Sequence, residues 1–301
     1  MKKENTQVTK LRNSALLLLT SLIWGVAFVA QSEGMNYVGP CTFVCSRFFL
    51  AFLVLFPIVL FRRKKRLGTL APYPLTVKAG ILCGLALGSA SLFQQYGIMT
   101  TSVGKSGFIT SLYIIIVPIL GIFLKRKIPF IVWIGAAIAA VGMYLLCMTE
   151  SLRIQSGDIL VFACAIVFSI QILFVDTFNE KGVDGIEMSC LQFLTAGCIG
   201  LLGTIFFEKP TLANIQGALI PVLYAGLLSS AVGYTLQIIG QKGLNPTIAA
   251  LLMSLESVFS VLAGWVLLGQ VLSRKELLGC ALTFTAVILV QIPFPERKKT
   301  D

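Results

Sequence analysis

The sequence contains no histidine, and only 12% of its residues are charged. Without histidine, a Ser-His-Asp or Cys-His catalytic group, an HExxH zinc site and a His-ligated haem are all excluded. Soluble domains carry about a quarter charged residues, so the low charge argues against a soluble fold. The sequence also has no P-loop and no CxxC pair among its eight cysteines. We therefore expect no catalytic site, no metal and no cofactor.

Apolar residues, in contrast, are abundant. They make up 56% of the 301 residues, and the mean hydropathy is +0.89. One membrane crossing needs about 20 apolar residues, so ten crossings would use about 200 residues and leave room only for short links and tails. We therefore expect an all-α integral membrane protein whose function lies among its helices.

Apolar runs between charged, glycine or proline breaks predict ten transmembrane helices. The first run follows several cations, as in a signal peptide, but Phe28 stands where a cleavage site needs a small residue. We interpret this run as an uncleaved first span. The spans are expected near residues 13–32, 42–61, 76–98, 103–124, 129–148, 157–176, 186–206, 216–240, 246–268 and 276–293.

The charge is unevenly distributed along this pattern. Lys and Arg outnumber Asp and Glu by 24 to 13, which in a soluble chain would suggest nucleic-acid binding. Cytoplasmic loops of membrane proteins collect Lys and Arg. With the N-terminus inside, the cytoplasmic segments hold 18 cations and the outer segments hold 5. The count predicts a multi-pass protein of the plasma (inner) membrane, with both termini in the cytoplasm and no nucleic-acid partner.

The two halves of the chain are related to each other. Residues 93–124 align with residues 236–267 at an offset of 143, with six identities where about two or three are expected by chance. Each half then holds five spans, an odd number, so the second half enters the membrane from the opposite face. We predict two inverted five-helix repeats, 13–148 and 157–293, with the site at the midplane between them. The identical pairs are Gln94/Gln237, Gly97/Gly240, Ser111/Ser254, Leu112/Leu255, Gly121/Gly264 and Leu124/Leu267.

Two segments carry a family resemblance. Residues 101–113 (TSVGKSGFITSLY), followed by Val117-Pro118, resemble the fourth span of EamA-type members of the drug/metabolite transporter superfamily, and residues 254–259 (SLESVF) with 264–269 (GWVLLG) resemble the ninth. The resemblance covers nearly the whole chain as two EamA units. It implies a plasma-membrane carrier of small metabolites, often an exporter of amino acids or related compounds. This chain departs from the family's frequent residues at Ser257, often Pro, and at Gln270, often Glu.

Single residues within the spans also predict local features. Glu256 lies halfway along span 246–268, roughly 15 Å of helix from either surface. A carboxylate at that depth costs several kcal/mol unless it is protonated, paired or in contact with water, so Glu256 is either a functional group or a structural link between helices. Arg47 is expected to reach the outer interface with its long side chain, and Lys105 to lie at the outer mouth.

Small residues and a proline predict how the helices pack. Gly80, Gly84 and Gly88 are spaced by four residues, which indicates close contact with a neighbouring helix. Pro118, in the middle of span 103–124, predicts a kink there.

Polar and aromatic side chains recur on one face of several spans. In span 216–240 the face carries Ser230, Tyr234 and Gln237, continued by Gln241. Amides serve both ammonium and carboxylate groups, so such faces suit a zwitterionic or amphipathic solute, with hydrogen bonding between helices as the alternative. We expect the substrate to be bound by Trp24, Gln31, Gln94, Tyr113, Gln171, Tyr234, Gln237 and Glu256.

The favoured function is a secondary carrier that exports amino acids or related compounds by alternating access. Within the carrier class, nucleoside-like or sugar-like solutes and toxic organic cations are the alternatives. An intramembrane enzyme would need catalytic groups that the chain mostly lacks, and a channel would need repeated rings of charge or carbonyl groups. The expected partners are a small metabolite and the lipid bilayer, and both a monomer and a homodimer remain open.

Overall fold

The computed structural model describes residues 2–65, 71–101, 103–126, 128–147, 155–268 and 273–291. All regular structure in these segments is helical. The helices are α1 (Lys2–Gly34), α2 (Pro40–Lys64), α3 (Tyr73–Ile98), α4 (Val103–Ser111), α5 (Tyr113–Phe123), α6 (Phe130–Cys147), α7 (Ser156–Glu180), α8 (Gly185–Phe207), α9 (Leu212–Gly217), α10 (Leu219–Leu223), the π-helix η1 (Tyr224–Tyr234), α11 (Thr235–Gln241), α12 (Pro246–Met253), α13 (Glu256–Leu268) and α14 (Arg274–Gln291).

Eight helical segments in the described part of the chain are long and apolar enough to cross a membrane. α10, η1 and α11 together form one of them, Leu219–Gln241, and α6 is a shorter apolar helix. Several expected features lie outside the described residues: the ends of the repeats at 148 and 292–293, Gln270 with its neighbour Gly269, and the C-terminal residues.

The expected span 103–124 consists of two helices, α4 and α5, which meet at Leu112. Leu112 keeps helical dihedral angles, but its amide donates to the Ile109 carbonyl at 3.2 Å, a bond of the 3₁₀ type. A 3₁₀ turn inside a helix often marks a hinge. Pro118, where the sequence predicts a kink, lies inside α5, after this break.

The expected span 246–268 is broken as well, between α12 and α13. The Leu255 amide donates to the Leu252 carbonyl at 3.4 Å, again a bond of the 3₁₀ type. At the offset of 143 residues, Leu255 corresponds to Leu112, so each half of the chain breaks at the same position. The repeat was predicted from the sequence, but the breaks were not.

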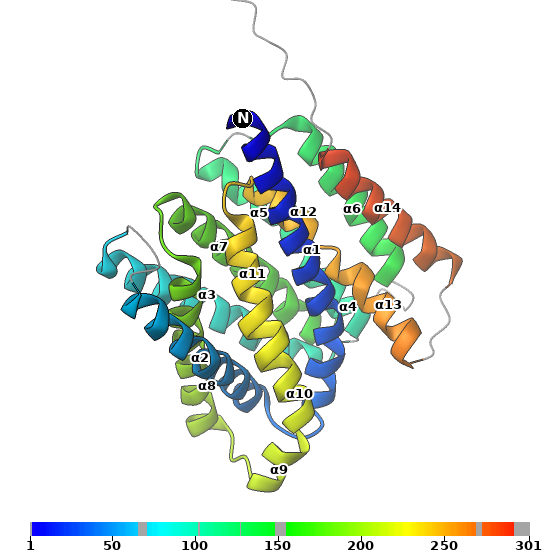
Figure 1. The fold of residues 1–301 in the computed structure, drawn as a ribbon. Coiled ribbons are helices and arrows are strands. Elements are labelled where there is room, and N and C mark those ends of the chain that lie inside the picture. Colours follow the sequence, from blue (N-terminus) through cyan, green and yellow to red (C-terminus); the bar gives the residue numbers. More distant parts are fainter. Residues whose placement is uncertain are drawn as a thin grey trace, which may run out of the picture.

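Helices of the two halves pack in matched pairs. α3 contacts α7 and α8, just as η1 contacts α1 and α2. α4 and α5 lie on α7, just as α12 and α13 lie on α1, while α2 pairs with α8 and α6 with α14. Figure 1 shows the α6–α14 pair at one edge of the bundle and α2, α3 and α8 at the other. Exchanging the two halves therefore exchanges equivalent contacts, as expected for a two-repeat architecture.

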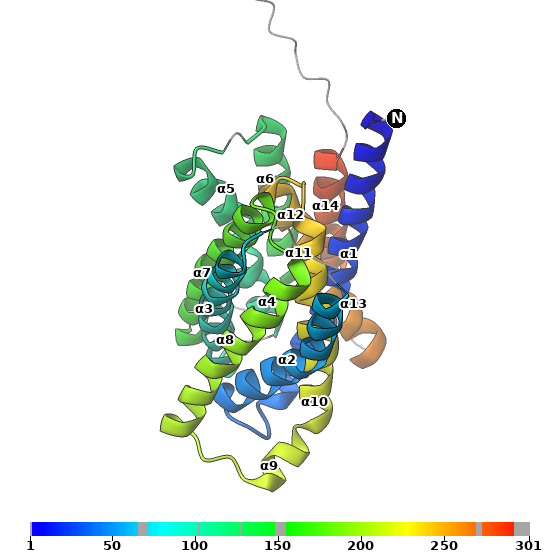
Figure 2. The ribbon, with the colours of Figure 1, turned by 60° about the vertical axis from the view of Figure 1, so that its left-hand side comes forward.

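The links between helices gather at the two ends of the bundle. The start of α1, the α5–α6 link and the α11–α12 link lie at one end, and α9 lies at the opposite end (Figure 2). We call the first the α1-start end and the second the α9 end.

Close packing of α3 against α8 confirms the interpretation of the glycine series. A Cβ atom at Gly84 would lie 2.7 Å from the Gln192 carbonyl oxygen, and one at Gly88 would lie 3.0 Å from the Ala196 Cα atom. These are backbone atoms, which cannot move aside as a flexible side chain does.

We expect Gly84→Ala to destabilise the protein, because the added methyl group forces α3 away from α8. Overpacking of this kind costs about 1–3 kcal/mol. The matched control is Gly121→Ala on α5, where the nearest atom to the new Cβ lies 3.5 Å away. Thermal unfolding in detergent measures both variants, and equal melting temperatures would contradict the close α3–α8 contact.

Candidate functional site

A small cavity lies inside the bundle, between helices of both halves. Its volume is about 20 Å³, which is room for about one water molecule. In this conformation the cavity is therefore too small for an organic metabolite. The lining residues are Trp24, Ala27, Phe28, Gln31, Arg47, Gln94, Thr110, Phe168, Ser229, Tyr234 and Glu256.

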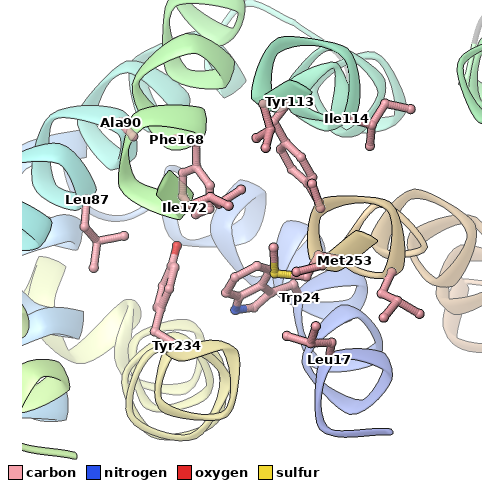
Figure 3. Packing of buried hydrophobic residues seen from close by; sticks show 14 of the residues in the cluster. Leu17, Trp24, Leu87, Ala90, Tyr113, Ile114, Phe168, Ile172, Tyr234 and Met253 are labelled. Carbon is pink, nitrogen blue, oxygen red and sulfur yellow. The ribbon is translucent and has the colours of Figure 1, made fainter. Parts of the chain in front are cut away.

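Three aromatic rings lie close together at this site. Trp24 of α1 lies 4.7 Å from Tyr234 of η1 and 5.9 Å from Phe168 of α7, and the last two rings are also 5.9 Å apart, centroid to centroid. Figure 3 shows the three side chains pointing toward one another from their separate helices. One ring comes from the first half and two from the second, so the two halves are in direct aromatic contact at the cavity.

The π-helix determines which residues of the expected span 216–240 reach the cavity. The indole Nε1 of Trp24 donates to the Ser229 carbonyl at 3.1 Å, and Ser229 and Tyr234 both line the cavity. The sequence placed Ser230 on this face, assuming 3.6 residues per turn. The wider turn of η1 changes that spacing, and the Ser230 hydroxyl is buried without a hydrogen-bond partner.

The two broken helices meet at one polar cluster. The Tyr113 hydroxyl donates to Oε1 of Glu256 at 3.0 Å, and the Ser111 hydroxyl lies 3.4 Å from the same oxygen. Ser111 and Ser257 hydroxyls are 2.7 Å apart. Glu256 lines the cavity, whereas Tyr113, which was predicted as a lining residue, touches it only through Glu256 and through stacking on Phe168 at 6.2 Å.

Arg47 corrects one expectation. It does not extend to the outer interface, because only 1% of its surface is exposed and it lines the cavity. Its guanidinium donates to the Gln31 side-chain oxygen at 3.2 Å and to the Ser91 hydroxyl at 2.9 Å, and it lies 4.5 Å above the Phe48 ring. The sequence pattern missed it because the bends and crossings of the helices, not position along a span, decide depth.

The predicted glutamines separate into two groups. Gln31 and Gln94 line the cavity, and Gln94 donates to the Thr110 hydroxyl at 3.2 Å. Gln171 and Gln237 do not line it. The Gln237 amide donates to the Gln171 side-chain oxygen at 3.0 Å, so these two join α11 to α7 behind the cavity.

Charged pairs join α7 to the broken helix of the first half at both of its ends. At the α9 end, Lys105 binds Asp158, which also accepts a hydrogen bond from Thr101 at 2.9 Å. Toward the α1-start end, Arg126 pairs with Asp176 at 2.6 Å and with Glu180 at 3.0 Å. A pocket of about 550 Å³ opens beside Arg126.

Both halves of the chain match one known protein family. The sequence model of the EamA-like transporter family matches residues 13–148 and 155–292. The chain belongs to the EamA-like transporter family. The resemblance seen in residues 101–113 and 254–269 is therefore confirmed.

Relatives of this EamA-like protein are named as transporters. It is 27% identical to an uncharacterized transporter of Archaeoglobus fulgidus, over 92% of this chain and 84% of the relative. It is 22% identical to the uncharacterized transporter YoaV of Bacillus subtilis (94% and 97% covered) and 24% identical to the uncharacterized inner membrane transporter YedA of Escherichia coli K12 (90% and 88%). A crystal structure has the same fold, with a TM-score of 0.78 at 17% identity, covering 93% of this chain and 98% of the other. The protein is thus a multi-pass membrane transporter.

We expect Tyr113→Phe to destabilise this transporter by about 1 kcal/mol, because it removes the phenolic donor to Glu256. The matched control is Tyr144→Phe, since the Tyr144 ring is partly exposed and its hydroxyl makes no hydrogen bond in the described structure. Thermal unfolding compares the two variants. An unchanged melting temperature for Tyr113→Phe would contradict a stabilising bond where the two broken helices meet.

Proposed function

We propose that this EamA-like transporter is a secondary carrier that moves a small organic metabolite by alternating access. The observation that carries the proposal is the small cavity walled by side chains of both halves, at the point where the two broken helices meet. Discontinuous helices at the interface of two repeats are the usual construction of a carrier's binding site. A cavity that holds about one water molecule fits the occluded state of such a cycle.

The charged pairs on α7 support the same proposal. Lys105–Asp158 closes one end of the α4/α5–α7 contact, and Arg126 with Asp176 and Glu180 closes the other. Alternating access requires one end to open while the other stays closed. We propose that the two ion-pair contacts, one at each end of α7, open in turn during this cycle.

Ten transmembrane helices in two inverted five-helix repeats, 13–148 and 157–293, complete the proposal. The eight long segments, the shorter α6 and its partner α14 make up the ten. An odd number of spans in each half inverts the second half relative to the first. We assign the α1-start end to the cytoplasm, because the basic links lie there, and the membrane to the plasma (inner) membrane, as in the name of YedA.

Amino acids or related compounds are the substrate class that we propose, with export as the direction. The lining offers amides, hydroxyl groups, four large aromatic rings and one charged group of each sign, Arg47 and Glu256. That combination suits a solute that has both a polar head and an apolar part. Nucleoside-like or sugar-like solutes and organic cations are the alternatives that the experiment compares.

Transport is tested with purified protein in proteoliposomes. Vesicles loaded with unlabelled amino acids are expected to take up labelled amino acid by saturable counterflow. Ala27→Trp is expected to abolish this uptake, because it fills the cavity, while the matched Ala137→Trp, on an exposed position of α6, keeps it. Unsaturable flux, or uptake by Ala27→Trp equal to that of Ala137→Trp, would contradict a carrier with this site.

The orientation is tested with reporter domains fused after Asp301 and within the 62–74 segment. Both are expected to be active on the cytoplasmic side, because 18 of the cations fall on that side in the ten-span topology. A C-terminal reporter that is active only outside would overturn this topology.

Glu256→Gln separates a proton-carrying role of this side chain from a structural one. The amide keeps the acceptor oxygen for Tyr113, so we expect unchanged thermal stability and intact substrate exchange at fixed pH. Glu256→Ala leaves the Tyr113 hydroxyl unpaired, and we expect it to lose about 1–3 kcal/mol. Proton coupling predicts that Gln also abolishes pH-driven accumulation. Identical pH profiles for Gln and wild type would leave Glu256 as a structural link.

A further inference from the structure

Arg47 is the most deeply buried cation of the site and is incompletely satisfied. A guanidinium has five N–H donors. Two of its bonds go to neutral acceptors, Gln31 and Ser91, and the buried Nε has no hydrogen-bond partner.

No carboxylate neutralises this guanidinium in the described part of the chain. The ion pairs there involve Arg62, Arg63, Lys105 and Arg126, and none involves Arg47. Glu256 lines the same cavity but bonds to Tyr113 and Ser111 instead. A buried charge is strongly unfavourable when it lacks a counter-ion, and inside a membrane such a residue marks a binding site by default.

We propose that Arg47 binds the carboxylate of the transported solute and thereby restricts the substrates to carboxylic acids. This inference rests on the proposed carrier function. The planar guanidinium matches a carboxylate with two parallel hydrogen bonds, and Arg47 lines the cavity with its Nε donor still unpartnered.

The charge balance of the cavity narrows the class further. Arg47 and Glu256 are its two ionisable lining groups of opposite sign. A doubly charged phosphate ester would meet one cation only. An organic cation would meet Arg47 with like charge, and Glu256, the group of opposite charge, already accepts hydrogen bonds from Tyr113 and Ser111. A monoanionic carboxylate that also carries an ammonium or a neutral polar group fits, with its apolar part against Trp24 and Phe168.

Competition between an acid and its own carboxamide tests the proposal. Counterflow and thermal stabilisation are measured with a panel of α-amino acids and hydroxy acids, each beside its amide, for example leucine and leucinamide. The amide keeps the size and shape of the acid and loses only the negative charge. In the wild type we expect the acid to be preferred on the order of 10- to 100-fold.

Two variants of Arg47 and one control locate the preference. Arg47→Gln is expected to reduce the acid-to-amide ratio to within a few-fold. Arg47→Lys keeps the positive charge but loses the planar group that forms two parallel hydrogen bonds. We expect it to keep the preference for the acid over the amide, with about tenfold weaker affinity. Arg63→Gln is the matched control, the same change on the same helix in a pair with Glu187 outside the cavity, and is expected to keep the wild-type ratio. The ratio is measured within each protein, so a loss of folded material does not imitate the effect.

The outcomes separate this inference from the proposed function. Counterflow of amides or organic cations equal to that of the acids would overturn the role of Arg47 but not the proposed carrier function. Acids that stabilise the wild type but not Arg47→Gln, with no flux, would leave the role of Arg47 standing and overturn the carrier. If no compound of the panel is transported by the wild type or stabilises it, both the role of Arg47 and the proposed carrier function are overturned.

Discussion

The structure depends on one constraint: inside a bilayer, polar groups must find their partners within the protein. The two broken helices show how the chain meets it. Each break places hydroxyl and carboxyl groups deep in the bundle, and these groups satisfy one another, Ser111 with Ser257 and Tyr113 with Glu256. Irregular backbone at this depth is tolerated only where protein or a cavity surrounds it. The helix breaks are therefore found where the two broken helices meet beside the cavity.

The repeat explains why two different residues contact each other where the broken helices meet. At the offset of 143, Tyr113 and Glu256 occupy the same position in the two halves, and they contact each other. Two copies of one residue at such a place would be two tyrosines or two carboxyl groups, and a pair of carboxylates repels. One donor and one acceptor form a directed hydrogen bond instead. The halves can therefore share a fold while differing at the position where they meet.

Much of the fold could be predicted from the sequence, because apolar runs follow from the thickness of the bilayer and the internal offset indicates two repeats. The glycine series and the depth of Glu256 follow in the same way. The breaks at Leu112 and Leu255 could not be predicted, since no proline or glycine marks either. The place of Arg47 could not be predicted either, because its depth depends on how α1, α2 and α3 cross. The sequence also predicts some wrong residues on the cavity face of span 216–240. The prediction assumes the residues per turn of an α-helix, and the π-helix has a wider turn.

The remaining asymmetry between the halves lies in what holds each broken helix. α7 is joined to α4 and α5 by ion pairs at both ends, whereas none of the described ion pairs joins α1 to α12 or α13. There Gly25 lets α1 approach the backbone of α13, with its Cβ position 2.8 Å from the Glu256 carbonyl oxygen. Close apolar packing resists sliding at either end alike, but an ion pair gives way when water reaches it. Because α7 also carries Phe168, these ion pairs hold in place a helix that forms one wall of the cavity.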